Sequence, residues 1–341
     1  MEQQAIITVK DLRTYFYSDK RCNKVLNGVS FELYKGRTLC VVGESGCGKS
    51  VTASSIMQLL PKLSRIESGA ITYHSEKGDI RIDQLPRNGK EMRALRGRDI
   101  AMIFQDPMTA LNPVYTIGFQ IGEDLKYHTD LDKRSRRART LELLTQMGIS
   151  TPEKRIDQYP HEFSGGMRQR AMIAMAMSCS PKVLIADEPT TALDVTIQAQ
   201  VLQLMNKLKQ KLGMAMLLIT HDLGIVAQTC DRVAVMYSGE VIEIGTVQDI
   251  FESDKHHPYT VGLFGSIPDM EKETKRLQPI PGLMPDPSIL YSGCRFSDRC
   301  PHCSEECRQE KPALFVEGTH RIWCNRFVVK DAQNDSGGMT E

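Results

Sequence analysis

The chain contains 341 residues, enough for one large domain or two modest ones with a sizeable hydrophobic core. Its 43 Lys and Arg residues and 42 Asp and Glu residues give a net charge of +1, so no overall positive field would recruit nucleic acid. The sequence contains neither a secretory signal nor an apolar run of roughly 20 residues, the length of a membrane helix. We therefore expect a cytosolic protein, in which disulfide bonds do not account for the ten cysteines.

The first part of the chain has the pattern of short strands. Residues 6–16 and 25–33 are rich in β-branched and aromatic residues, and a polar turn separates them. Residues 69–73 and 79–82 are further strand candidates. Together these segments predict a small antiparallel sheet.

A glycine-rich segment between the first strands fits the pattern G-x-x-x-x-G-K-(S/T) of a phosphate-binding loop. It consists of Gly43, Glu44, Ser45, Gly46, Cys47, Gly48, Lys49 and Ser50, and Val51 follows. The apolar residues 38–42 before it favour a buried parallel strand, and residues 51–60 favour a helix that stops at Pro61. In such a loop, backbone N–H groups and the helix N-terminus surround phosphate oxygens. Lys49 can reach the β- and γ-phosphates and Ser50 can bind Mg²⁺, so we predict a nucleoside triphosphate site.

A helical pattern occupies residues 107–160 and is clearest at residues 132–148, where apolar residues recur at helical spacing. A further helix is expected to begin at Ser164-Gly165-Gly166 and to extend to residue 178.

Strands and helices then alternate. Residues 183–186 and 214–220 are predicted as buried strands, and residues 198–212 as a helix closed by Gly213. This alternation predicts a parallel α/β core with its ligand site at the carboxyl ends of the strands.

Two acidic residues, Asp187 and Glu188, directly follow the apolar residues 183–186. Next to a phosphate-binding loop, Asp187 would hold Mg²⁺ directly or through water, and Glu188 would act as the general base that polarises the attacking water. The alternative is an acidic pair that only ends a strand, and the preceding loop makes the catalytic interpretation the stronger one.

The segment Phe163-Ser164-Gly165-Gly166-Met167 resembles the L-S-G-G-Q signature of the ATP-binding cassette (ABC) family. In that family the signature caps the γ-phosphate held by a second cassette, so the resemblance implies a head-to-tail dimer. Phe163 and Met167 depart from the pattern, and Met167 lacks the polar side chain of glutamine. The N–H groups of Ser164, Gly165 and Gly166 remain available at a helix N-terminus.

The resemblance implies roles for further residues that occur in the family's order. Gln105 matches the Q-loop, near Mg²⁺ and the attacking water, and joins the core to the helical region. Asp194 matches the D-loop at the dimer interface, and His221 matches the switch histidine that contacts the γ-phosphate. The implied catalytic set is therefore Lys49, Gln105, Glu188 and His221. An aromatic residue at the end of the first strand would stack on adenine: we expect Phe16, with Tyr15 and Tyr17 as alternatives.

Residues beyond the cassette, among them His257-Pro258-Tyr259-Thr260, look like the peptide/nickel importer branch, and more narrowly like ATP-binding subunits of dipeptide and oligopeptide importers. That resemblance implies an ATPase (a translocase) on the cytoplasmic side of the inner membrane. Its partners would be two permease subunits, a second and often non-identical ATPase, and an extracytoplasmic peptide-binding protein. Residues 106–120 would contact a permease. Import of nickel or another small solute is an alternative, whereas a soluble ABC ATPase acting on DNA or ribosomes is disfavoured by the single cassette and the near-zero charge.

Five of the ten cysteines lie close together near the C-terminal end, in a spacing that favours a metal over disulfides. Some importer ATPases of this branch carry a 4Fe–4S cluster on a similar C-x5-C-x6-C-x16-C pattern. That pattern selects Cys294, Cys300, Cys307 and Cys324 and leaves Cys303 unused. Zinc, for which the Cys300–Cys303 pair is suited, and uncoordinated thiols are the alternatives.

The expected fold is therefore an α/β P-loop NTPase (RecA-like) with a parallel sheet core, an antiparallel β subdomain, an inserted α-helical subdomain and a cysteine-rich C-terminal extension. We place the ABC ATPase domain at residues 1–254, with its helical subdomain at about 107–162. The C-terminal extension would cover residues 255–329, and residues 330–341 are expected to be a disordered tail.

Overall fold

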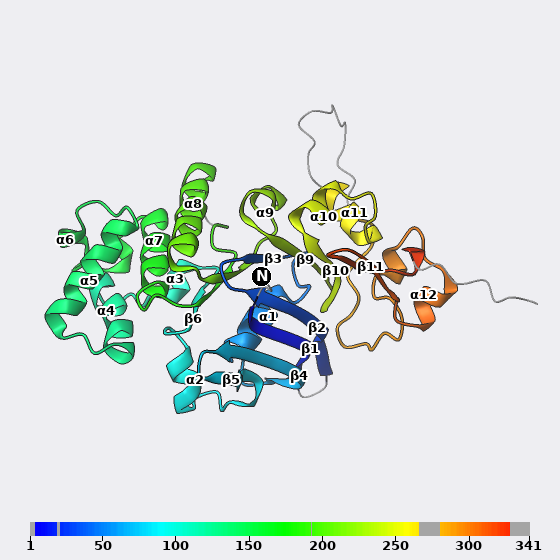
Figure 1. The fold of residues 1–341 in the computed structure, drawn as a ribbon, viewed down its shortest axis with the longest axis horizontal. Coiled ribbons are helices and arrows are strands. Elements are labelled where there is room, and N and C mark those ends of the chain that lie inside the picture. The colour runs from blue at the N-terminus through cyan, green and yellow to red at the C-terminus, as the bar shows by residue number, and fades with distance from the viewer. Residues whose placement is uncertain (1–3, 19–20, 192, 266–279, 328–341) are drawn as a thin grey trace, which may run out of the picture.

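A computed structural model describes residues 4–18, 21–191, 193–265 and 280–327 (Figure 1). The predicted tail, residues 330–341, lies outside the described residues. None of the helices within the described ranges is long and apolar enough to cross a lipid bilayer.

The N-terminal half contains an antiparallel sheet of four strands. These are β1 (Ala5–Ser18), β2 (Arg21–Tyr34), β4 (Ser64–Ser75) and β5 (Gly78–Arg81), and they are arranged in the order β2-β1-β4-β5. All neighbouring pairs are antiparallel, which confirms the predicted small sheet. Its apolar face, with Ile7, Leu26 and Ile71, packs in one cluster with Ile56, which follows the phosphate-binding loop.

The second sheet has eight strands and forms the centre of the molecule. They are β3 (Thr38–Val42), β6 (Ile100–Ile103), β7 (Val183–Asp187), β8 (Ala215–Ile219), β9 (Arg232–Tyr237), β10 (Glu240–Thr246), β11 (Leu314–Glu317) and β12 (His320–Trp323). The order is β11-β12-β10-β9-β3-β8-β7-β6. From β9 to β6 the neighbours are parallel, as predicted.

The prediction of a parallel core sheet is wrong at one edge. Strand β10 runs antiparallel to β9, and β12 and β11 continue the sheet in the same antiparallel manner. The reversal occurs at Ser238 and Gly239, which both have positive φ, 45° and 81°, the conformation of a tight hairpin turn. The core is therefore a mixed α/β sheet.

The helices predicted at residues 132–148, 164–178 and 198–212 are present, and each begins and ends within three residues of those bounds. The helical part contains α3 (Pro107–Ala110), α4 (Ile117–His128), α5 (Lys133–Gln146), α6 (Pro152–Arg155) and α7 (Gly165–Ala176). The other α-helices are α1 (Lys49–Ile56), α2 (Lys90–Leu95), α8 (Val195–Leu212), α9 (Leu223–Thr229), α10 (Val247–Glu252), α11 (Pro258–Gly265) and α12 (Glu305–Gln309). Short 3₁₀ helices are η1 (Ile82–Gln84), η2 (Pro160–Glu162), η3 (Ser297–Arg299) and η4 (Asn325–Phe327).

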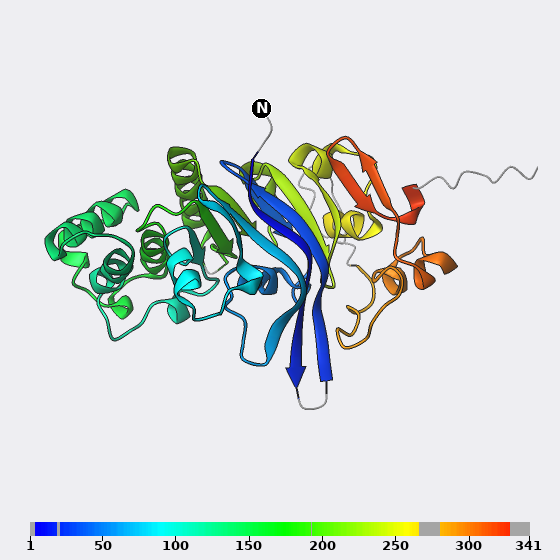
Figure 2. The same cartoon turned by 60° about the horizontal axis from the view of Figure 1, so that its bottom comes forward.

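Helix α1 is shorter than the helix predicted for residues 51–60. It ends at Ile56 because Gln58 adopts a left-handed conformation (φ 52°), and the Gln58 side chain donates a hydrogen bond to the Ile82 carbonyl instead. Helix α8 ends as predicted, since Gly213 takes the left-handed conformation after it. Figures 1 and 2 place the helical part and the C-terminal part (residues 255–265 and 280–327) on opposite sides of the central strands.

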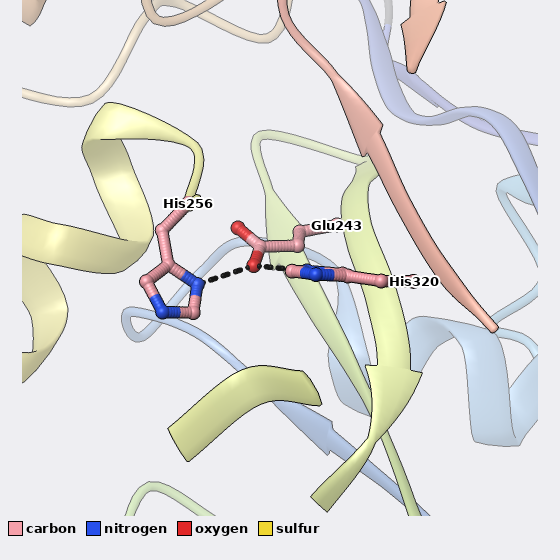
Figure 3. A group of neighbouring side chains, drawn as sticks. All are labelled: Glu243, His256 and His320. Atoms are coloured by element: carbon pink, nitrogen blue, oxygen red, sulfur yellow. Dashed lines mark hydrogen bonds and ion pairs between the residues drawn. The ribbon is translucent and has the colours of Figure 1, made fainter. Parts of the chain in front are cut away.

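A buried carboxylate, Glu243, ties the C-terminal part to the central sheet (Figure 3). One of its oxygens accepts hydrogen bonds from His256 (2.7 Å) and from His320 of β12 (2.8 Å). The other accepts from the Thr260 hydroxyl and from the His257 N–H group. Burial alone would raise the pKa of Glu243, but these donors outweigh it and lower the pKa to about 2. The distances are those of hydrogen bonds. The charged carboxylate therefore accepts all four donors and joins β10 to residues 256–260 and to β12.

Candidate active site

The phosphate-binding loop joins the end of β3 to the start of α1 in a conformation that only glycine adopts easily. Gly43 and Gly48 have φ values of 151° and 108°. A Cβ atom on Gly43 would lie 2.2 Å from the Met236 carbonyl oxygen. The positive φ values therefore favour glycine at both positions, and close packing against β9 adds to this requirement at Gly43.

Lys49 lies at the start of α1, 6% exposed, with its ammonium group turned back over the loop. The ammonium donates hydrogen bonds to the carbonyl oxygens of Gly43 (2.8 Å) and Glu44 (3.1 Å). A cation is thus held where phosphate oxygens would enter the loop.

An oxygen pair suited to Mg²⁺ lies beside the loop. The Ser50 hydroxyl donates to Oδ1 of Asp187, the last residue of β7, at 3.0 Å. Burial raises the pKa of Asp187, an effect that the Ser50 hydrogen bond opposes. One hydroxyl and one carboxylate leave most of the octahedral shell of Mg²⁺ for water and phosphate oxygens, so the residues present fit that ion.

Glu188 gathers the other predicted catalytic side chains. Its Oε2 atom accepts hydrogen bonds from the Gln105 amide and from the Thr191 hydroxyl, both at 3.0 Å. Its Oε1 atom lies 3.6 Å from Nδ1 of His221, whose side chain is 61% exposed. Gln105, Glu188 and His221 follow β6, β7 and β8, which are adjacent in the sheet, so their carboxyl ends bring the three residues together. Thr191 is not among the residues predicted from the sequence, because its contact with Glu188 depends on the tight turn after that residue.

The signature residues lie elsewhere. Ser164 caps α7, and its hydroxyl accepts the Met167 N–H group at 3.4 Å. Helix α7 is on the side of the helical part, away from α1 (Figure 1). Within the described residues, no hydrogen bond joins Ser164, Gly165 or Gly166 to the phosphate-binding loop. Asp194 similarly caps α8 by accepting the Ile197 N–H group at 3.0 Å.

The aromatic residues near the end of β1 differ in their surroundings. Phe16 is half-buried and pairs with Asn23 of β2 and Ser64 of β4. The Tyr17 hydroxyl donates to Glu67 at 2.6 Å, and the Arg65 guanidinium lies 4.7 Å from the Tyr17 ring centroid. One face of Tyr17 is thus already covered by a cation.

The four cysteines selected by spacing gather in the C-terminal part. Burial raises the pKa of the Cys294 thiol to about 12, and Cys307, Cys324 and Cys300 add to that rise, so the thiols are close enough to influence one another. The His302 N–H group donates to the Cys300 sulfur at 3.4 Å. Backbone N–H groups two residues on, at Phe296 and Arg326, similarly lower the pKa of Cys294 and Cys324 against the larger effect of burial.

These sulfurs are more widely spaced than a zinc site requires. Within the described residues, no three of the thiols have sulfur atoms all within 4.8 Å of one another. Four sulfurs at Zn–S distances of 2.3 Å would lie about 3.8 Å apart.

Comparisons with known proteins agree with this arrangement. Residues 26–191 match the family described as ABC transporter, and residues 242–307 match the oligopeptide/dipeptide transporter, C-terminal region. The dipeptide transport ATP-binding protein DppD of Bacillus subtilis is 48% identical, over 94% of each chain. The oligopeptide transport ATP-binding protein AppD of the same organism is 48% identical, over 96% of this chain and 98% of its own.

A solved structure with a similar fold is a dimeric, post-hydrolysis state of the ATP-binding cassette MJ0796 with ADP and Pi. It is 25% identical, with a TM-score of 0.62, and the match covers 71% of this chain and 98% of that one. The family match, the two relatives and the similar fold show that the chain belongs to the ABC transporter family, as one of its ATP-binding, ATP-hydrolysing proteins.

Proposed function

We propose that the chain is the ATP-hydrolysing subunit of a transporter that imports dipeptides or oligopeptides. The observation that carries the ATPase role is the convergence of Gln105 and His221 on Glu188, beside the Ser50–Asp187 pair. The peptide cargo is supported by the relatives named as dipeptide and oligopeptide transport proteins and by the C-terminal match over residues 242–307.

Lys49, Ser50 and Asp187 would bind the substrate. Lys49 exchanges its hydrogen bonds to the loop carbonyls for the β- and γ-phosphate oxygens of ATP. Ser50 and Asp187 supply a hydroxyl and a carboxylate oxygen to Mg²⁺, which neutralises charge on the phosphates when bound. Phe16 would stack on adenine, with Tyr15 as the alternative; Tyr17 is disfavoured because Arg65 already covers one of its faces.

Glu188 would accept the proton of the attacking water. The Gln105 amide and the Thr191 hydroxyl hold its Oε2 atom, which leaves Oε1 on the side of His221. His221 is exposed enough to turn toward the γ-phosphate when ATP is present. Catalysis then consists of orienting the water and removing its proton.

The site is completed by a second cassette. Helix α7, which Ser164 caps, lies away from α1 of its own chain, so the N–H groups of Ser164, Gly165 and Gly166 would cap the γ-phosphate of a partner ATPase subunit, identical or not. ATP would close the two cassettes, and hydrolysis would reopen them. The pair would lie on the cytoplasmic side of the inner membrane, where residues 106–120 contact the permease subunits and an extracytoplasmic peptide-binding protein supplies the cargo.

We also propose that Cys294, Cys300, Cys307 and Cys324 hold a 4Fe–4S cluster, with zinc as the alternative. The donor set fits, because four thiols gather with backbone N–H groups directed at three of them. Such a cluster would supply a rigid cross-link between segments of the C-terminal extension.

Purification without oxygen is expected to yield about four irons and four sulfides per chain, because four thiolates satisfy four irons. Cys307→Ser should lose most of this iron, whereas Cys303→Ser, which removes the unused cysteine, should keep it. Iron, sulfide and zinc are measured on the purified protein. One zinc per chain without sulfide would refute the proposal.

The transport function is tested with the chain assembled with its permeases and partner ATPase in lipid. ATP hydrolysis is expected to rise when the peptide-binding protein is added with a dipeptide, and to stay at its basal rate when that protein is added empty. Recovery of ribosomes or DNA in place of permeases, or stimulation by nickel and not by peptides, would contradict the proposal.

A further inference from the structure

Two residues of the C-terminal part, Arg299 and Tyr259, contact Glu44 of the phosphate-binding loop. We propose that both are positioning residues for ATP binding: they fix Glu44, and through Glu44 the loop carbonyls that hold Lys49. This goes beyond the transport function, because it gives residues outside the cassette motifs control over nucleotide affinity.

Arg299 makes a two-pronged ion pair with Glu44. Its two terminal nitrogens lie 2.7 Å and 3.0 Å from the two Glu44 carboxylate oxygens, and its side chain is only 5% exposed. Its Nε atom donates to the Pro281 carbonyl at 2.8 Å. Because the planar guanidinium is itself held by Pro281, its two parallel hydrogen bonds fix the direction of the Glu44 carboxylate and stabilise its negative charge.

Tyr259 holds the backbone of the same residue. The Glu44 N–H group donates to the Tyr259 hydroxyl at 2.8 Å, and Tyr259 is fully buried. The Tyr259 ring packs against Tyr237 at the end of β9, with centroids 4.7 Å apart, and against Phe296 at 5.6 Å. The backbone N–H group of Arg299 donates to the backbone carbonyl of Phe296. Tyr259 and Arg299 therefore both contact Phe296 and belong to one packed unit.

Every polar group of Glu44 therefore has an assigned partner. Its carboxylate binds Arg299, its N–H group binds Tyr259, and its carbonyl accepts from Lys49 at 3.1 Å. The Glu44 N–H group and the Gly43 carbonyl belong to one peptide plane, so the Tyr259 contact also fixes the direction of the Gly43 carbonyl, which accepts a hydrogen bond from Lys49 at 2.8 Å. The N–H groups of the following loop residues are then presented to the triphosphate without a further ordering cost.

A purely structural role, in which Arg299 only anchors the C-terminal part, is the alternative. Other contacts already provide that anchor. Strand β12 pairs with β10, and the Arg295 guanidinium donates to the carbonyl and hydroxyl oxygens of Ser238, both at 3.1 Å. Because these contacts remain when Arg299 is lost, we expect the loss of Arg299 to affect the phosphate-binding loop before it affects the anchoring of the C-terminal part.

The test measures the Kd of MgATP for the full-length chain with a fluorescent ATP analogue. Arg299→Met keeps the apolar stem and is expected to raise the Kd about tenfold or more, the effect of losing charge-assisted hydrogen bonds. Arg299→Lys should recover only part of the affinity, because lysine cannot bind both oxygens. Tyr259→Phe, which removes one acceptor, should raise the Kd about threefold. The control Arg308→Met breaks an exposed ion pair with Asp298 in the same region and should leave the Kd unchanged.

A double-mutant cycle separates positioning from anchoring. Glu44→Gln combined with Arg299→Met should weaken ATP binding no more than the stronger single variant does, because both changes break one interaction. Independent, multiplicative effects would overturn the proposal. So would an unchanged Kd in both Arg299→Met and Tyr259→Phe while thermal unfolding shows a lowered stability. If Arg299→Met does not fold, Tyr259→Phe decides the question alone, since it keeps the buried ring.

Discussion

Glu188→Gln is expected to lower the rate of ATP hydrolysis by about 10²–10⁴-fold while leaving ATP binding intact, because it removes the general base and little else. Glutamine has nearly the same shape, so the hydrogen bonds that Gln105 and Thr191 make to this side chain can be replaced by rotated amide contacts. Removing a negative charge next to the γ-phosphate should also lengthen the life of the ATP-bound dimer.

Two measurements check this expectation: steady-state phosphate release, and the mass of the ATP-bound species by light scattering with the partner cassette present. The matched control is Glu76→Gln, a carboxylate whose side chain is 87% exposed and which pairs with Lys182 at 3.2 Å. The control should hydrolyse ATP at the parent rate. Parent-like turnover in Glu188→Gln would show that another group acts as the base.

The hydrolytic side of the site could be predicted from the sequence because its residues mark the ends of buried strands. Asp187, Glu188 and His221 each follow an apolar run of strand length, and parallel strands end at one edge of the sheet. In the structure, Nδ1 of His221 accordingly lies 3.6 Å from Oε1 of Glu188. The phosphate-binding loop could be predicted for a related reason, since its glycines are dictated by local backbone conformation.

The rest depends on contacts between distant segments. Nothing near Glu44 indicates that Arg299, 255 residues away, would close an ion pair on it. Strand β12 extends the central sheet only because Glu243 and Ile322 meet across segments that are far apart in the chain. Even the end of α1 is set at long range, since the Gln58 side chain leaves the helix to bind the Ile82 carbonyl. The local sequence pattern predicts helices and strands, whereas long-range packing decides which sheet edges and loops these elements contact.

Lys49→Ala is expected to have the opposite signature to Glu188→Gln, with ATP binding lost and the fold retained. Removing a buried, charge-assisted partner of the phosphates should cost about 2–5 kcal/mol of binding free energy, which raises the Kd about 30-fold or more.

The fold should survive the Lys49→Ala change because no carboxylate forms an ion pair with Lys49 among the described residues; its partners are the carbonyls of Gly43 and Glu44. Asp187, the buried carboxylate whose pKa Lys49 helps to lower, keeps its hydrogen bond from Ser50, so thermal unfolding without nucleotide should stay close to that of the parent chain. Lys182→Ala, which removes an exposed lysine, controls for the loss of a positive charge and should bind ATP normally. Titration with a fluorescent ATP analogue and thermal unfolding with and without MgATP give both quantities. An unfolding temperature that still rises with MgATP as it does in the parent would mean that the loop holds the triphosphate through its N–H groups alone, and that Lys49 contributes to hydrolysis but not to binding.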